Sequence, residues 1–242
     1  MSNSKKSTKP ALVIMKRELG TYFSSPIAYI VTGLFLIISG IMFFTAFFLQ
    51  NRASLRNLFS LLPILLSFFI PALTMRLYAE EKKSGSIETL YTLPVTEFDV
   101  VLGKYLAALI AAAAMIAPTL LYLIGILPFG LPDAGPVIGG YLGTIFLCAA
   151  FTSIGLFASS ITKNQIIAFF TGFIICIVLT MISEFLIFLP GPIVGFLQFI
   201  SANQHFTSIS RGIIDTRDLV YFVSLTAFFF SLTVICQQNE SK

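Results

Sequence analysis

The sequence predicts an all-α integral membrane protein with six transmembrane helices in a single transmembrane domain over residues 1–242. Three observations favour this class: 57% of the residues are hydrophobic, only 11% are charged, and the mean hydropathy is +0.93. Soluble chains carry about 25% charged residues. The low share of charged residues arises because long apolar runs are separated only by short polar segments. This composition excludes a water-soluble fold.

The N-terminal region is expected to lie on the membrane surface. Residues 1–10 are polar and lysine-rich, which indicates a tail, and residues 11–25 are predicted to form an interfacial helix. Its apolar residues recur at helical spacing, at Leu12, Met15, Leu19, Tyr22 and Phe23. Lys16 and Arg17 could reach lipid phosphates from its flanks. The alternative is a cytosolic helix docked on protein. No cleavable signal peptide is expected, because the first apolar run is longer than a signal sequence needs.

Six apolar runs are long enough to cross a bilayer. The predicted spans are 27–49, 58–78, 105–127, 137–161, 165–189 and 219–236. A helix rises 1.5 Å per residue, so about 20 residues cross about 30 Å of hydrocarbon. Pro63 and Pro71 are expected to kink the second span, either as hinge points or as packing features.

Between the second and third spans lies a polar island, Arg76 to Lys104, which holds nine of the chain's 26 charged residues. Gly85 is expected to interrupt the helix that enters this island, and Pro94 to stop the one that follows. The remaining helix has about two turns, with one apolar face formed by Ile87, Leu90 and Tyr91. So short a helix needs a surface to pack on, either its own protein or a soluble partner.

Local motifs mark further features. Thr96 to Asp99 matches a capping pattern, so a helix should begin there and enter the membrane beyond Lys104. Gly135, Gly139 and Gly143 give two overlapping G-x-x-x-G patterns, which favour close helix contact, either at a dimer interface or within the chain.

The segment between the fifth and sixth spans is predicted to form a pair of short extracytoplasmic helices. Residues 193–200 are apolar but too few to cross the membrane, and residues 201–211 form a polar, helix-like stretch closed by Gly212. The Asp-Thr-Arg-Asp run at 215–218 then starts the sixth span by capping.

Few residues in the apolar part offer chemistry. Glu184 is a candidate functional charge inside the membrane, although near the interface it could reach water or Arg211. His205 is the only histidine, and no acidic or cysteine neighbour at ligand spacing indicates a metal site. The cysteines lie inside apolar runs, at Cys148, Cys176 and Cys236, and indicate neither a disulfide framework nor a zinc site.

The run EKKSGSIETLYTLP at residues 81–94, continuing to Gly103-Lys104-Tyr105, resembles the cytoplasmic loop motif of ABC-2 type transporter permeases. The opening Lys16-Arg17-Glu18-Leu19 and the Tyr-Phe-Ser-Ser-Pro run at 22–26 are most similar to the gliding-motility-associated, GldF-like permeases.

This resemblance implies that residues 80–94 form a coupling helix that docks on a separate ATP-hydrolysing subunit. The implied coupling residues are Glu80, Glu81, Gly85, Ile87, Glu88, Leu90, Tyr91, Leu93 and Pro94. It further implies a second permease subunit, expected to be identical, and for the GldF-like branch an auxiliary membrane subunit with an extracytoplasmic domain. ATP and Mg²⁺ would bind the ATPase, because this chain has no G-x-x-x-x-G-K-[ST] loop and needs no cofactor of its own.

The distribution of cations predicts the orientation. Eleven lysines and arginines flank one side of the six predicted spans and four flank the other. By the positive-inside rule, both termini and the coupling segment lie in the cytoplasm. The resemblance implies that the chain lies in the cytoplasmic membrane of a bacterium. Since the cations sit at the ends of apolar runs, nucleic-acid binding is not expected, and membrane lipid is the expected anionic partner.

Three other functions are weighed against an ABC permease. An ion-gradient-driven secondary transporter would need charges near the bilayer midplane, for which Glu184 is the candidate. A non-transporting anchor of an extracytoplasmic assembly would transmit force rather than move a substrate. An intramembrane enzyme is the least supported, because the apolar spans contain no plausible set of nucleophile, base and acid.

Overall fold

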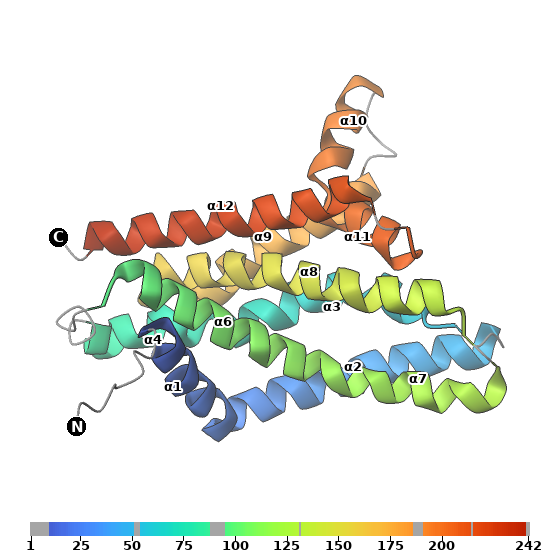
Figure 1. Ribbon diagram of the computed structural model, residues 1–242, viewed down its shortest axis with the longest axis horizontal. Coiled ribbons are helices and arrows are strands. Elements are labelled where there is room, and N and C mark those ends of the chain that lie inside the picture. Colours follow the sequence, from blue (N-terminus) through green and yellow to red (C-terminus); the bar gives the residue numbers. More distant parts are fainter. Residues whose placement is uncertain are drawn as a thin grey trace, which may run out of the picture.

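The computed structural model describes residues 10–50, 54–87, 95–130, 132–185, 191–213 and 215–240. Every regular element in these ranges is a helix, which confirms the predicted all-α class (Figure 1). The elements are α1 (Pro10–Ser24), α2 (Pro26–Gln50), α3 (Arg56–Thr74), α4 (Arg76–Ser84), α6 (Glu97–Ile116), η1 (Ala117–Thr119), α7 (Leu120–Ile126), η2 (Leu127–Phe129), α8 (Ala134–Ser160), α9 (Gln165–Phe185), α10 (Gly191–Ile200), α11 (Ala202–Ser210) and α12 (Thr216–Glu240).

Six helical segments of the described chain are long and apolar enough to cross a membrane, and they lie roughly along the long axis of the molecule (Figure 1). These segments are Pro26–Leu49, Arg56–Ser84, Glu97–Phe129, Ala134–Ser160, Gln165–Phe185 and Thr216–Glu240. The third begins at Glu97, where the Thr96 side chain caps the helix, as the capping pattern predicts.

The helix α8 forms the centre of the bundle and packs against α3, α6, α9, α11 and α12. Its small residues make this possible. A Cβ atom at Gly140 would overlap the ring of Phe59, and one at Gly155 would overlap Thr74 on α3. Small residues therefore let the helix backbones approach closely, as in other membrane bundles.

The peripheral helices α2, α9 and α12 show the opposite pattern, because they expose large apolar side chains such as Ile37, Phe170 and Phe228. Apolar side chains at the surface are unfavourable in water but suit a hydrocarbon environment. The burial pattern therefore fits helices whose outer faces contact lipid.

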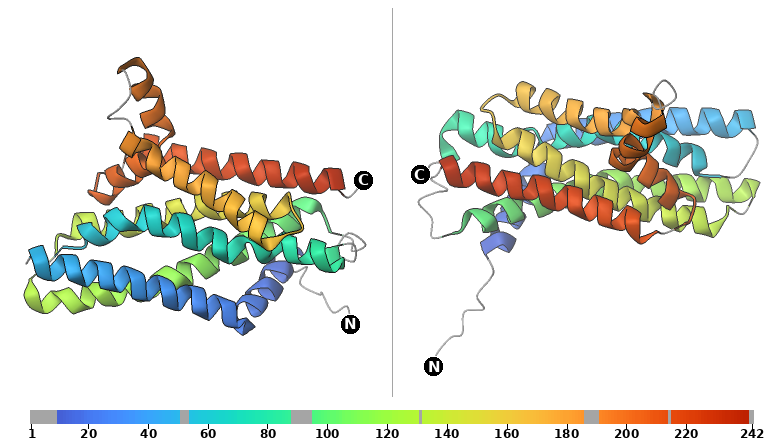
Figure 2. Two further views of the ribbon diagram at one scale, coloured as in Figure 1. Left: turned by 180° about the vertical axis from the view of Figure 1, so that it is seen from behind. Right: turned by 90° about the horizontal axis from the view of Figure 1, so that it is seen from above.

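The short helices between the last two spans differ in their surroundings. The helix α11 packs on α8, where a Cβ at Gly143 would lie 3.2 Å from Cγ2 of Ile209, and Gly139 faces the Ile209 carbonyl and Gly212. The G-x-x-x-G glycines thus serve a contact within the chain. Gly212 ends α11 with φ at +86°. The helix α10 projects away from the bundle (Figure 2).

The N-terminal helix α1 lies at an angle to α2 and packs on α6 (Figures 1 and 2). Its buried residues are Ala11, Ile14, Glu18 and Tyr22. Of the predicted apolar stripe, Tyr22 is buried, whereas Leu12 and Phe23 are exposed and available to lipid, as expected of an interfacial helix. Glu18 faces inward because Lys104 of α6 lies beside it and neutralises its charge. Leu12 and Phe23 remain on the outer side of α1.

Candidate functional site

The candidate site lies at the end of the bundle where α1, α4 and α6 meet. The helix α6 begins here with a reciprocal cap. The Thr96 hydroxyl accepts a hydrogen bond from the Asp99 N–H at 3.2 Å and donates one to the Asp99 carboxylate at 2.7 Å. This confirms the predicted capping pattern and sets the direction in which α6 carries Gly103 and Lys104 into the bundle.

Lys104 is fully buried and lies between two carboxylates from other helices. Its Nζ lies 2.9 Å from Glu81 Oε2 in an ion pair, and it donates hydrogen bonds to Glu18 Oε1 at 3.2 Å and to the Leu77 carbonyl at 2.8 Å. The same Nζ lies 5.0 Å from the centre of the Tyr78 ring. A buried ammonium needs such partners, because an unpaired charge away from water is strongly unfavourable.

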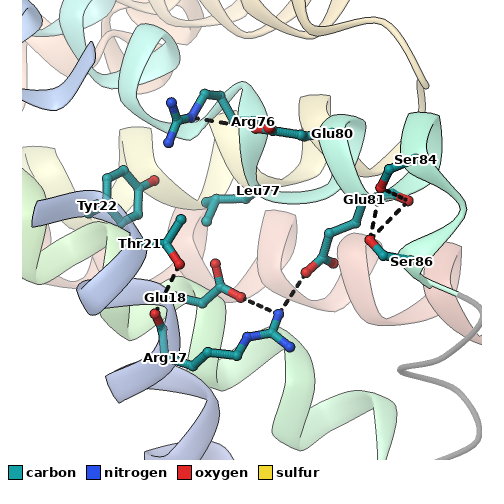
Figure 3. Close-up of a pocket in the computed structure, with 10 residues that line it drawn as sticks. All are labelled: Arg17, Glu18, Thr21, Tyr22, Arg76, Leu77, Glu80, Glu81, Ser84 and Ser86. Atoms are coloured by element: carbon teal, nitrogen blue, oxygen red, sulfur yellow. Dashed lines mark hydrogen bonds and ion pairs between the residues drawn. The ribbon is translucent and has the colours of Figure 1, made fainter. Parts of the chain in front are cut away.

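Arg17 completes the cluster by bridging the same two carboxylates. Its Nη2 donates to Glu18 at 2.7 Å and to Glu81 at 2.8 Å (Figure 3). Burial alone would lower the pKa of Arg17, but the hydrogen bonds and charges of Glu18 and Glu81 outweigh it, so the pKa of Arg17 is raised. We call Arg17, Glu18, Glu81 and Lys104 the Lys104 cluster. It joins α1, α4 and α6 with balanced charge.

A cleft of about 560 Å³ opens beside this cluster, between α1 and α4 (Figure 3). Its lining residues are Arg17, Glu18, Thr21, Tyr22, Arg76, Leu77, Glu80, Glu81, Ser84 and Ser86. The buried Tyr22 hydroxyl donates to the Leu73 carbonyl at 2.7 Å, and burial raises the pKa of Tyr22. Arg76 donates to the Ser25 hydroxyl at 2.8 Å, which ties the end of α1 to the start of α4.

A second ionic contact anchors the other side of α4. The buried Lys82 forms an ion pair with Glu240 of α12 and donates to the Ser160 carbonyl at the end of α8. The helix α4 is thereby held on one side by α1 and α6 and on the other by α8 and α12.

The junction between α3 and α4 is supported by a serine from α8. The α3 helix runs through both prolines and is interrupted at Met75, four residues beyond Pro71, rather than at either proline. The Ser159 hydroxyl accepts from the N–H groups of Tyr78 and Ala79 at 3.0 and 3.1 Å and donates to the Met75 carbonyl at 2.9 Å. Met75 itself provides no side-chain cap, so Ser159 caps α4 from a neighbouring helix.

The structure describes only part of the predicted coupling segment. Glu80 is exposed and pairs with Arg76 at 3.7 Å, whereas Glu81 belongs to the Lys104 cluster. Gly85 has φ at +77° and ends α4, as predicted. Ile87 is buried. The remaining predicted coupling residues lie outside the described residues: Glu88, Leu90, Tyr91, Leu93 and Pro94.

The other predicted candidate, Glu184, lies away from this site. It is exposed, next to the last residue of α9, and no ion pair joins it to Arg211 among the residues that the structure describes.

Sequence reasoning did not single out Glu18, Arg17, Lys82, Lys104 or Ser159 as parts of one site. The signal that could have indicated these residues is a charge within a helix that adjoins an apolar run. It does not identify the partners, because Arg17 and Glu81 are 64 positions apart and Glu18 and Lys104 are 86 positions apart. Only packing brings them together.

A family model described as "ABC-2 family transporter protein" matches residues 45–236. Two curated relatives, each named "Probable multidrug ABC transporter permease YbhR", from Escherichia coli strain K12 and Escherichia coli O157:H7, are 26% identical to this chain over 156 residues. The match covers 64% of this chain but 42% of each relative, so it spans less than half of the relatives' length.

Six membrane-crossing segments and an all-α bundle define a multi-pass membrane protein. Because the family match extends over more than half of the sequence, the chain belongs to the ABC-2 transporter family, and its membrane domain is that of an ABC transporter permease.

Proposed function

We propose that this chain is the transmembrane permease subunit that couples ATP hydrolysis in a separate ATPase subunit to export, or to mechanical work, across the cytoplasmic membrane. The observation that supports this proposal is the attachment of α4. This helix leads into the motif at 81–94. It is fastened by ion pairs to α1, α6 and α12 and by a hydrogen bond from Lys82 to α8. A force applied beyond Gly85 would therefore act on several spans at once.

The ATPase would contact the segment that follows α4. In this proposal, ATP and Mg²⁺ bind the ATPase, and this chain supplies no catalytic group. The predicted contact surface is formed by Glu80, Glu88, Leu90, Tyr91, Leu93 and Pro94. Ile87 is buried within this chain and does not belong to that surface. Glu81 has a different task, because its ion pairs with Arg17 and Lys104 pass the motion of α4 to the neighbouring helices.

Co-purification tests the docking surface. Substituting Leu90→Asp or Tyr91→Asp should abolish recovery of the ATPase with the permease, since an ionised carboxylate would be buried in an apolar contact. Ile161→Asp is the matched control, because Ile161 is an exposed apolar residue at the turn between α8 and α9, on the same side of the predicted topology. Unchanged ATPase binding by folded Leu90→Asp and Tyr91→Asp variants would refute this docking surface.

The same proposal places both termini in the cytoplasm of a bacterium. The cation asymmetry along the sequence supports this orientation. The contact between Lys82 and Glu240 also brings the end of α12 next to α4, at the end of the bundle where α1 lies (Figure 1). A second, identical permease subunit would complete the membrane part, and cross-linking of two differently tagged copies would test it.

Two kinds of output are compatible with this coupling. The curated relatives are named as multidrug permeases, which favours export of a substrate. The GldF-like N-terminal run instead favours force transmission in a gliding-type complex with an auxiliary membrane subunit. Vesicles that contain permease and ATPase should export a compound in the first case. ATPase activity that depends on an extracytoplasmic accessory protein, without export, would favour the second.

An ion-gradient-driven transporter is less well supported. Glu184, its candidate charge, is exposed next to the end of α9 rather than buried within the bundle. Proton-dependent uptake by vesicles that lack the ATPase would support this alternative.

A further inference from the structure

His205 joins three helices near the end of α12 that lies farthest from Glu240. The ring is buried, and it belongs to α11. Its Nδ1 lies 2.6 Å from Oδ1 of Asp218 on α12, and its Nε2 lies 3.0 Å from the carbonyl oxygen of Phe199 on α10. The imidazole is therefore a link between α10, α11 and the start of α12.

Both partners of this ring accept hydrogen bonds. A carbonyl oxygen cannot donate, and an ionised carboxylate cannot donate either, whereas a neutral imidazole has only one N–H group. The two contacts of His205 can thus form together only if the His205–Asp218 pair holds one proton more than a neutral imidazole beside a carboxylate. An imidazolium, with N–H groups at Nδ1 and Nε2, satisfies both contacts.

The charges around the ring favour the same state. Asp218 is buried, and no lysine or arginine in the described part of the chain forms an ion pair with it. Its Oδ2 is buried without a hydrogen-bond partner. The N-terminus of α12 favours a negative charge at Asp218, which lies in the first turn. Without a proton on His205, the enclosed carboxylate would lack its neutralising partner.

The remaining groups that face the ring are aromatic. The Tyr221 ring of α12 stacks on the imidazole with centroids 4.1 Å apart, and the Phe199 ring of α10 meets its edge at 6.0 Å. Aromatic faces attract cations. The Tyr221 hydroxyl also donates to the Ile200 carbonyl at 2.6 Å, a direct bond between α12 and α10 that does not involve His205. Within the described residues, Asp218 is the acidic side chain paired with His205.

We propose that His205 and Asp218 form a proton-binding site in which an imidazolium–carboxylate pair fastens α10 and α11 to the start of α12. When the proton leaves, the ring keeps one N–H group and loses one of its two contacts. The attachment of α10, which otherwise projects from the bundle, then weakens. The site does not depend on how the opposite end of the protein couples to an ATPase.

Nuclear magnetic resonance of the full chain tests the site directly, because His205 is the only histidine in the sequence. Protein labelled with ¹⁵N-histidine, in lipid nanodiscs at pH 7, should show both ring nitrogens protonated. Asp218→Asn should shift the resonance of one nitrogen to that of an unprotonated imidazole nitrogen at the same pH. A wild-type spectrum with one unprotonated nitrogen would overturn the proposal.

Asp215→Asn is the matched control. Asp215 is an exposed acid near Asp218 whose carboxylate accepts the Arg217 N–H at 3.0 Å. This variant should give the wild-type spectrum. If Asp215→Asn and Asp218→Asn shift the nitrogen resonance equally, the shift reflects the loss of any nearby negative charge. The His205–Asp218 pair would then not be the proton-binding site.

Hydrogen exchange tests the mechanical consequence. After correction for the pH dependence of chemical exchange, the backbone amides of residues 191–200 should lose protection as the pH is raised through the range in which the nitrogen resonance shifts. The Asp218→Asn variant should show no such transition. Constant protection of α10 in the wild type across the deprotonation of His205 would refute its fastening role.

Discussion

Lys104 shows how one buried charge can organise three helices. Its ammonium group has no exposed surface, yet it lies within ion-pairing distance of Glu18 and Glu81, and it also bonds the Leu77 carbonyl. Removing one member of a buried ion pair typically costs about 3–5 kcal/mol, because the partner charges stay enclosed. The stability of this end of the bundle should therefore depend on the complete cluster.

Lys104→Met should lower the free energy of unfolding by about 3 kcal/mol. The estimate is at the low end because Arg17 remains beside both carboxylates and Glu81 is partly exposed. Thermal unfolding of the purified protein in detergent would measure the loss. Lys83→Met is the control, since Lys83 is an exposed lysine on α4, the helix that carries Glu81. Equal stability of the two variants would show that the cluster contributes little.

Ser159 provides hydrogen-bond partners for backbone groups at the start of α4, as Lys104 provides a counter-charge for carboxylates. Ser159→Ala would remove the acceptor for the Tyr78 and Ala79 N–H groups, at a cost of about 1–3 kcal/mol if they are left without a partner. Hydrogen exchange should then increase in α4.

Ser160→Ala should leave α4 unchanged. The Ser160 hydroxyl donates within its own helix, to the Phe157 carbonyl, and the backbone carbonyl that accepts from Lys82 is retained. If both serine variants protect α4 equally well, Ser159 is not the cap of this helix.

At the scale of elements, α1 and α6 meet at a glycine. A Cβ atom at Gly103 would lie 2.7 Å from the Ala11 carbonyl oxygen and 2.8 Å from Cβ of Ile14. The backbone of α1 therefore lies too close for any side chain at this position. This contact also holds Glu18 of α1 next to Lys104, one residue along α6.

Gly103→Ala should displace α1 and destabilise the protein by about 1–3 kcal/mol, because the neighbour is a backbone atom that cannot rotate away. Unfolding in detergent measures the stability, and proteolysis between α1 and α2 reports the displacement. Gly20→Ala is the control, since no atom beyond the adjacent backbone of its own helix lies within 4 Å of the added carbon. A stable Gly103→Ala variant with α1 still protected would contradict the close contact.

At the scale of the whole molecule, the ionic contacts of α4 lie at one end of the bundle and His205 lies near the other. Asp218, the partner of His205, lies in the first turn of α12, and Glu240, the partner of Lys82, is its last residue. This arrangement gives each side of the membrane its own polar site. It also makes the orientation of the chain testable.

A membrane-impermeant maleimide added to intact bacteria should label Asp215→Cys and should not label Thr162→Cys. Both variants would be made in a Cys236→Ser background, because the other two cysteines are buried. Asp215 precedes α12, and Thr162 lies in the turn between α8 and α9. Permeabilised cells provide the control, in which both should react. The reverse labelling pattern would invert the predicted topology.

The sequence alone determined the class of this protein and much of its local structure. Long charge-free runs predict spans, because crossing hydrocarbon depends on length and apolarity. Gly85 ends α4 and Thr96 caps α6, as predicted, because both effects depend on residues a few positions apart. The interruption at Met75 was not predicted, because Ser159 of a distant helix stabilises it.

Only the tertiary structure decided which polar groups share a site. The inward face of α1 carries Glu18, which its apolar pattern did not indicate, because Lys104 of α6 lies there as its counter-charge. His205 pairs with Asp218, although their spacing in the sequence did not indicate a contact. In an interior that excludes water, a charge is stable only beside its counter-charge, and the packing of helices far apart in sequence determines where that counter-charge lies.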